Sequence, residues 1–157
     1  MTFALNIDRP LDLHGTNLPG VSFDGIRLAE GNIRKVTWRR TTLKRANLTD
    51  TDASEADFRG GSFQNAKLIR TDFRDSILIE NDLREADLTD ANLSGADLSG
   101  ADLRGARVTV AQLAAATISP ETKLPDGITH DAVATATAAL QHAAVRAGIN
   151  RKDIRYG

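Results

Sequence analysis

The chain has 157 residues, enough for one domain, and its 20 basic and 21 acidic side chains leave a net charge of −1. Bulk charge therefore singles out no class of partner. The absence of cysteine excludes a disulfide scaffold, a thiolate metal site and a cysteine nucleophile. No stretch is apolar enough to predict a membrane span, and the first residues lack the basic-then-apolar order of a secretory signal. We therefore expect a cytoplasmic protein.

A five-residue repeat occupies residues 11–108, after a segment, residues 1–10, that we expect to form an N-terminal cap. Every fifth residue from Leu13 to Leu113 is apolar, whereas chance would fill about nine of these 21 positions. A small residue precedes most of these centres by two places, and the other three positions are mainly polar. Inward positions two residues apart follow the strand period, so each block predicts a short strand and a bend. A helix is excluded, because five residues advance about 500° around its axis, so successive centres would point about 140° apart.

The blocks ADLTDANLSGADLSGADLRG at 86–105 resemble the pentapeptide-repeat family, whose consensus is A(D/N)LXX. The resemblance covers residues 11–108 and is looser before Ala46, where Val21, Ile26 and Val36 replace the small residue. It implies an all-β solenoid, a right-handed quadrilateral β-helix of about five coils in which four blocks make one coil.

Four blocks per coil would stack residues 20 positions apart, which makes specific expectations for the core. The small centre Ala53 would lie between Ile33 and Phe73, and we expect larger neighbours to fill the space that it leaves. Asn81, a polar residue at an inward position, should donate a hydrogen bond to a coil carbonyl. Trp38 stands at a centre position, so we expect it in the core.

Residues 109–157 leave the repeat and predict a C-terminal cap. The sequence from Thr109 to Gln112 has the order of a capping box, which favours a short helix at 110–116 over a further coil. Prolines and a glycine predict a loop at 118–127, and an amphipathic, alanine-rich helix is predicted at 130–147. This helix could cover the last coil or pair with its own copy. The resemblance raises the second option, because several family members pair through C-terminal segments, and the candidate dimer residues are Val133, Leu140 and Ala144.

No motif predicts catalysis, a cofactor or a metal ion. His14, His130 and His142 have no second ligand at metal-binding spacing, and no nucleophile or phosphate-binding motif occurs. Carboxylates that would stack, such as Asp82 on Asp102, stand where the repeat consensus already places Asp or Asn. We therefore expect a protein that is not an enzyme.

Charge varies along the chain. Residues 31–45 carry six basic side chains and no acid, whereas residues 46–105 carry 13 acids and six bases. The resemblance implies one specific function for an acidic rod, since some family members mimic DNA and inhibit or protect DNA gyrase and topoisomerase. The acids outside the consensus position are the candidates for such a surface: Asp50, Glu55, Asp75, Glu80, Glu85 and Asp90. Interrupting arginines and the net charge of −1 argue against this function.

The basic segment at 31–45 could touch nucleic acid or an acidic protein. Direct nucleic-acid binding is not expected, because Trp38 is assigned to the core and no exposed aromatic residues accompany the bases.

Two apolar residues point outward next to the centre Leu78. These residues, Ile77 and Ile79, are the best candidates for a contact with another protein. We therefore expect a rigid protein–protein interaction module, with a DNA-mimic regulator of gyrase as the alternative. A second alternative, an enzyme or an accessory factor that scaffolds one, would need a pocket near His130 or His142.

Overall fold

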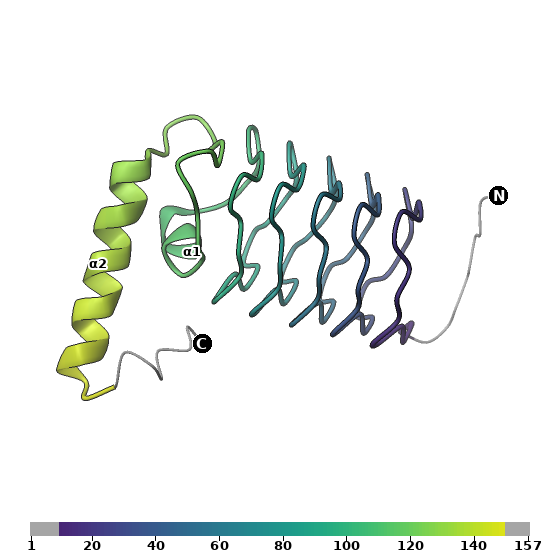
Figure 1. The fold of residues 1–157 in the computed structure, drawn as a ribbon, viewed down its shortest axis with the longest axis horizontal. Helices are drawn as coiled ribbons and strands as arrows, with labels where there is room; N and C mark the ends of the chain where they lie inside the picture. Colours follow the sequence, from purple (N-terminus) through teal and green to yellow (C-terminus); the bar gives the residue numbers. More distant parts are fainter. Residues whose placement is uncertain (1–9, 150–157) are drawn as a thin grey trace.

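The computed structural model describes residues 10–149, which form a rod of stacked coils with two helices at its C-terminal end (Figure 1). Helix α1 spans Val110–Ala114 and helix α2 spans His130–Arg146. The expected N-terminal cap lies outside the described residues except for Pro10, and so does the part of the expected C-terminal cap at 150–157.

Parallel bridges join residues 20 positions apart, from Asp12–Asn32 to Asp87–Arg107. Twenty residues hold four blocks, so the blocks of successive coils stack in register on four faces. The backbone N–H of each centre from Leu13 to Leu88 donates to the next coil, as from Leu43 N to Ser62 O at 2.7 Å. The chain is therefore a solenoid whose coils are joined by backbone hydrogen bonds.

The four faces are named after one buried centre each. In chain order, the Phe73 face has the centres Leu13, Ile33, Ala53, Phe73 and Leu93; the Leu78 face has Leu18, Trp38, Phe58, Leu78 and Leu98; the Phe63 face has Phe23, Leu43, Phe63, Leu83 and Leu103; and the Leu68 face has Leu28, Leu48, Leu68, Leu88 and Val108.

Each face ends in a tight turn that forms a corner of the coil. The carbonyl of a centre accepts the N–H three residues later, as Phe58 O does from Gly61 N at 3.0 Å. The last residue of the block is left-handed, with φ of 72° at Gly25 and 58° at Glu85. This conformation costs a non-glycine residue about 1–2 kcal/mol, so the stacking of the coils must offset it wherever the corner carries a side chain.

Large aromatic side chains fill the middle of the rod around Ala53, which is fully buried. The ring centroid of Phe73 lies 6.2 Å from that of Phe58 and 5.9 Å from that of Phe63, both in edge-on geometry. Phe58 and Phe63 belong to the same coil as Ala53, so the contacts of Phe73 reach into the layer where Ala53 leaves space. Trp38 is also fully buried and donates from Nε1 to Thr16 Oγ1 at 3.0 Å, which confirms its place in the core.

Several polar residues at inward positions share one hydrogen-bonding arrangement. The hydroxyls of Thr51 and Thr71 each donate to the carbonyl 23 residues earlier, at 2.7 Å. Asn81 does the same through Nδ2, which donates to Phe58 O at 2.8 Å, so the expected hydrogen bond is confirmed. Its Oδ1 is buried without a partner among the described residues.

Helix α1 replaces one stretch of coil at the C-terminal end of the rod. Gln112 and the N-cap Thr109 form the predicted capping box. After the helix, the chain rejoins the ladder through bridges from Thr117 to Asp97 and from Lys123 to Asp102. The expected short helix is present, whereas the expected loop at 118–127 is wrong in part, because Lys123 within it pairs with the ladder. The helix ends at Ala114 rather than at 116, because Thr117 must be extended to pair with Asp97.

Helix α2 packs on α1 and lies across the end of the rod (Figure 1). Thr129 is its N-cap and accepts from Ala132 N, and the helix ends one residue before the predicted 147, with Ala147 as C-cap. The hydroxyl of Thr137 donates to the carbonyl of Ala114, at 3.3 Å, and to that of Val133.

Candidate interaction surfaces

Ile77 and Ile79 lie on the Leu78 face, and both are partly exposed. Ile77 bridges Asp57 on the preceding coil and Asp97 on the following coil. The two isoleucines therefore form a small apolar spot between polar neighbours on an otherwise hydrophilic face. The rigid ladder beneath them holds their spacing constant.

The six candidate acids for a DNA-mimic surface all occupy left-handed corners, and the coil geometry spreads them around the rod. Asp50 and Asp90 share one corner, Glu55 and Asp75 share the next, and Glu80 and Glu85 stand alone on the remaining two. The structure therefore does not bring these acids together on one face.

Two of these six acids are neutralised within the protein. Asp50 Oδ2 pairs with Arg70 Nη2 at 2.6 Å, and Glu55 pairs with Arg34 and with Lys35. The hydrogen bond from Arg70 lowers the pKa of Asp50, and that from Arg34 lowers the pKa of Glu55.

Four of the acids at consensus positions are held by arginines two residues later in the same block. Asp57, Asp72, Asp82 and Asp102 pair in this way with Arg59, Arg74, Arg84 and Arg104. Hydrogen bonds from Arg84 and Arg104 lower the pKa values of Asp82 and Asp102. A carboxyl pair that shares a proton would need one raised pKa. The stacked carboxylates of Asp82 and Asp102 therefore do not have the properties of a proton-sharing pair.

Asp57 is the most strongly held of these carboxylates. Hydrogen bonds from Arg59 and then Arg39 lower its pKa to about 2, and its side chain is only 13% exposed. Arg39, which belongs to the basic segment at 31–45, is therefore paired with Asp57 and is not a free charge.

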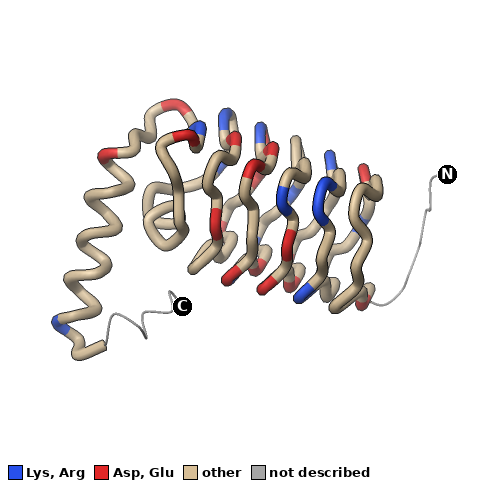
Figure 2. Tube along the Cα trace, in the orientation of Figure 1, with Lys and Arg blue, Asp and Glu red and all other residues tan. Residues whose placement is uncertain are grey.

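The basic segment wraps around one coil rather than forming a patch on one face. Arg40, Lys44 and Arg45 form no ion pair with any residue between 10 and 149, in contrast to Arg34, Lys35 and Arg39. Both signs of charge occur along the length of the rod (Figure 2).

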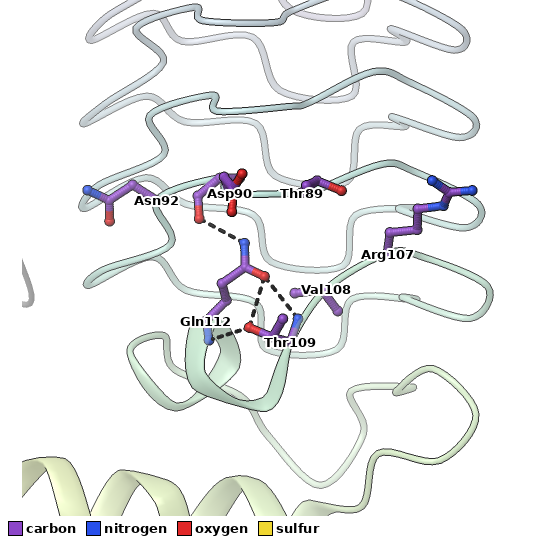
Figure 3. A pocket seen from close by; sticks show the side chains of 8 residues that line it. Thr89, Asp90, Asn92, Arg107, Val108, Thr109 and Gln112 are labelled. Carbon is purple, nitrogen blue, oxygen red and sulfur yellow. Dashed lines mark hydrogen bonds between the residues drawn. The ribbon is translucent and has the colours of Figure 1, made fainter.

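A cavity of about 630 Å³ lies where the last coil meets α1, and it is lined in part by Thr89, Asp90, Asn92, Arg107 and Gln112. Gln112 and Thr109 point toward each other, and Arg107 extends away from them (Figure 3). The side-chain amide of Gln112 is committed to the fold, because Nε2 donates to Leu88 O at 2.7 Å and to Ala91 O at 2.9 Å. Gln112 is therefore not free to bind a ligand in this cavity.

The histidines are outside this cavity. His14 and His142 are exposed, and Nε2 of the exposed His130 lies 3.2 Å from Ser119 O. Within residues 10–149, no cluster of His, Asp or Glu could hold a metal ion. Neither helix in this part of the chain is long and apolar enough to cross a membrane.

The exposed apolar residues of α2 differ from the expected dimer residues. Val133 is only 2% exposed and belongs to the core of its own chain, so its assignment to a dimer interface is wrong. Leu140 is 40% exposed and Ala144 is partly buried. Sequence reasoning missed Val145 and Ile149, which are also exposed.

The family model for pentapeptide repeats matches the chain in eight copies, over residues 22–60, 39–75, 62–95 and 82–119. The chain belongs to the pentapeptide-repeat family. No curated protein sequence matches it.

Three similar solved structures are pentapeptide-repeat proteins. HetL from the cyanobacterium Nostoc sp. strain PCC 7120, involved in heterocyst differentiation regulation, is 25% identical, with a TM-score of 0.44 over 66% of this chain and 49% of HetL. QnrB1, a plasmid-mediated fluoroquinolone resistance protein, is 22% identical, with a TM-score of 0.36 over 85% of this chain and 82% of QnrB1. Rfr23 from the cyanobacterium Cyanothece 51142 is 25% identical, with a TM-score of 0.33 over 73% of this chain and 88% of Rfr23. This pentapeptide-repeat chain thus spans about half the length of HetL.

Proposed function

We propose that this pentapeptide-repeat protein is a right-handed quadrilateral β-helix of about five coils, capped by its C-terminal helices, that acts as a rigid protein–protein interaction module without catalytic activity. The observation that supports this function is the pair Ile77 and Ile79, two apolar side chains held outward on the flat Leu78 face. An apolar spot with a polar rim is the usual composition of a protein contact.

The ladder lowers the conformational entropy that such a contact would lose on binding. Leu78 is fully buried between its neighbours and Ile77 is bridged on both sides, so the two isoleucines do not need to be ordered when a partner binds. A surface that is already ordered loses less conformational entropy on association.

Site-specific photo-crosslinking in the source cells tests this function. A photoreactive amino acid replaces Ile79 in one variant and Ile69, on the opposite Leu68 face, in the matched control. We expect a defined partner to crosslink from position 79, and we expect Ile77→Glu in the same chain to abolish the product. Equal crosslinking from both positions, or a product that survives Ile77→Glu, would contradict the assignment of this face.

The other proposals have less support from the described residues. A homodimer through α2 would use Leu140 and Ala144, and light scattering of Leu140→Glu tests it. Regulation of DNA gyrase stays an untested alternative, and the position of the candidate acids on four separate corners argues against it. A role as an enzyme or as an accessory factor that scaffolds one stays a prediction as well, as does the cytoplasmic location.

A further inference from the structure

Each of the two corners that border the Phe63 face carries a base on one coil and an acid two coils later. The corner residue on the coil between them is uncharged. One corner holds Arg40, Gly60 and Glu80 in successive coils, and the other holds Arg45, Asn65 and Glu85. Coils stack at about 4.8 Å, so base and acid stand about 10 Å apart on each corner.

These four charged side chains have no ion-pair partner between residues 10 and 149, where every salt bridge involves other groups. The acids lean away from the bases, over glycine corners of the next coil. Glu80 Cγ lies 3.4 Å from where a Cβ on Gly100 would stand, and the Glu85 carboxylate lies against Gly105. The rod therefore leaves both charges of each corner available to another molecule.

The Phe63 face is bordered by both of these corners, whereas the Leu78 face and the Leu68 face are each bordered by one of them. At the corner that the Phe73 and Leu78 faces share, Lys35 pairs with Glu55. At the corner that the Leu68 and Phe73 faces share, Asp50 pairs with Arg70.

A second copy of the chain is complementary to the Phe63 face. Consider two copies that lie antiparallel with their Phe63 faces in contact, related by a two-fold axis that runs between the faces along the coil of Phe63. In this arrangement Arg40 faces Glu80 of the other copy, and Arg45 faces Glu85. The axis passes through the neutral residues Ser62 and Gln64, so no like charges meet at the centre.

The rest of the face tolerates the same arrangement. Asp24 faces the Asp102–Arg104 pair of the other copy, in which Arg104 is already neutralised at 2.6 Å. Lys44 faces the Asp82–Arg84 pair, in which Arg84 is already neutralised at 2.8 Å.

We propose that two copies of this protein pair side by side and antiparallel through their Phe63 faces. The proposal deepens the proposed interaction function by naming a second copy as one partner. The rod is short, so the contact is smaller than the roughly 800 Å² per partner of a standard interface. The pairing is therefore weak, and it depends on charges that salt screens.

Sedimentation equilibrium of the full chain tests this pairing, at protein concentrations from about 10 μM to about 1 mM and at salt concentrations of about 0.02 M and about 0.5 M. We expect dimers at low salt whose Kd rises at least about tenfold at high salt. Arg40→Glu with Arg45→Glu should remove dimerisation, and so should Glu80→Arg with Glu85→Arg.

Two further variants make the test specific. The quadruple variant with all four charges reversed should dimerise again, because each corner again presents a base opposite an acid. The matched control, Asp75→Arg with Asp90→Arg, changes the net charge as much as the reversal of Glu80 and Glu85 does, but at corners that border the opposite Phe73 face. This control should retain the dimer, and circular dichroism checks that each variant is folded.

A monomer at every concentration would overturn the proposal, as would a quadruple variant that stays monomeric. A salt-insensitive dimer that survives all reversals would also overturn it and would point to α2. None of these results would affect crosslinking from position 79, so failure of the pairing and failure of the interaction function are distinguishable.

Discussion

Ala53 shows how a single residue is coupled to its neighbours in this core. It is fully buried at a position where the other centres of its coil are Phe58, Phe63 and Leu68. The rings of Phe58, Phe63 and Phe73 meet edge-on around it. The small side chain and the three large ones therefore form one packing unit.

We expect Ala53→Leu to lower the free energy of unfolding by about 1–3 kcal/mol, because the added volume must displace these rings. Urea denaturation measures the change. The double variant Ala53→Leu with Phe73→Leu should lose less stability than the sum of the two single variants, since the smaller residue at 73 makes room. Strict additivity would show that Phe73 does not fill the space at Ala53.

Asp57 links stability to pH. Its pKa of about 2 is lower than the 3.8 of an unperturbed Asp, because Arg59 and Arg39 donate to the carboxylate. The ionised form is therefore favoured in the folded protein, and its contribution is complete above about pH 5 and is lost as the pH falls toward 2.

At pH 7 we expect Asp57→Asn to reduce the free energy of unfolding by about 1–2 kcal/mol, a value discounted for the exposed arginine partners. The difference from the unmodified protein should shrink as the pH falls from 5 to about 2, as measured by urea denaturation at each pH. Asp97→Asn is the control on the same face, because Asp97 accepts hydrogen bonds from Ser99 and forms no ion pair among the described residues. A pH-independent difference for Asp57→Asn would contradict the assignment.

At the scale of the element, α1 closes the C-terminal edge of the ladder with a side chain. In the regular coils, the residue before a centre donates its backbone N–H to the carbonyl 21 residues earlier, as Asn92 N does to Thr71 O. Gln112 stands at the equivalent position, but its backbone N–H is used by the N-cap Thr109. Its Nε2 donates to Ala91 O instead, so the side-chain amide substitutes for the backbone donor of the missing strand.

We expect Gln112→Glu to destabilise the protein by about 2–3 kcal/mol, because a carboxylate cannot donate to the carbonyls of Leu88 and Ala91 and repels them. Gln112→Leu removes the donor without adding charge and should cost about 1–2 kcal/mol. Hydrogen exchange at the last coil and urea denaturation report both changes. If both variants were as stable as the unmodified protein, the amide would not hold the edge.

At the scale of the whole molecule, the arrangement of charge matters more than its amount. The acids outside the consensus lie on all four corners, and those at consensus positions are largely paired with arginines. A DNA mimic needs acids that follow a phosphate backbone along one surface.

We therefore expect purified DNA gyrase to supercoil DNA at an unchanged rate in the presence of a large molar excess of this protein, with or without a fluoroquinolone. The variant Glu80→Gln with Glu85→Gln should give the same result. Inhibition or drug protection that weakens with salt and is lost in this variant would establish the DNA-mimic function instead.

The amino-acid sequence by itself determined the solenoid, its buried centres and the position of both helices to within two residues. A five-residue period leaves one local solution, in which apolar centres and small partners point inward, and this explains Trp38 and Asn81 as well. Only the tertiary structure decided which outward residues share a face, because that depends on the stacking of blocks 20 residues apart. Stacking separated the six candidate acids, buried Val133 against its own chain and left Arg40, Arg45, Glu80 and Glu85 without partners in the described rod.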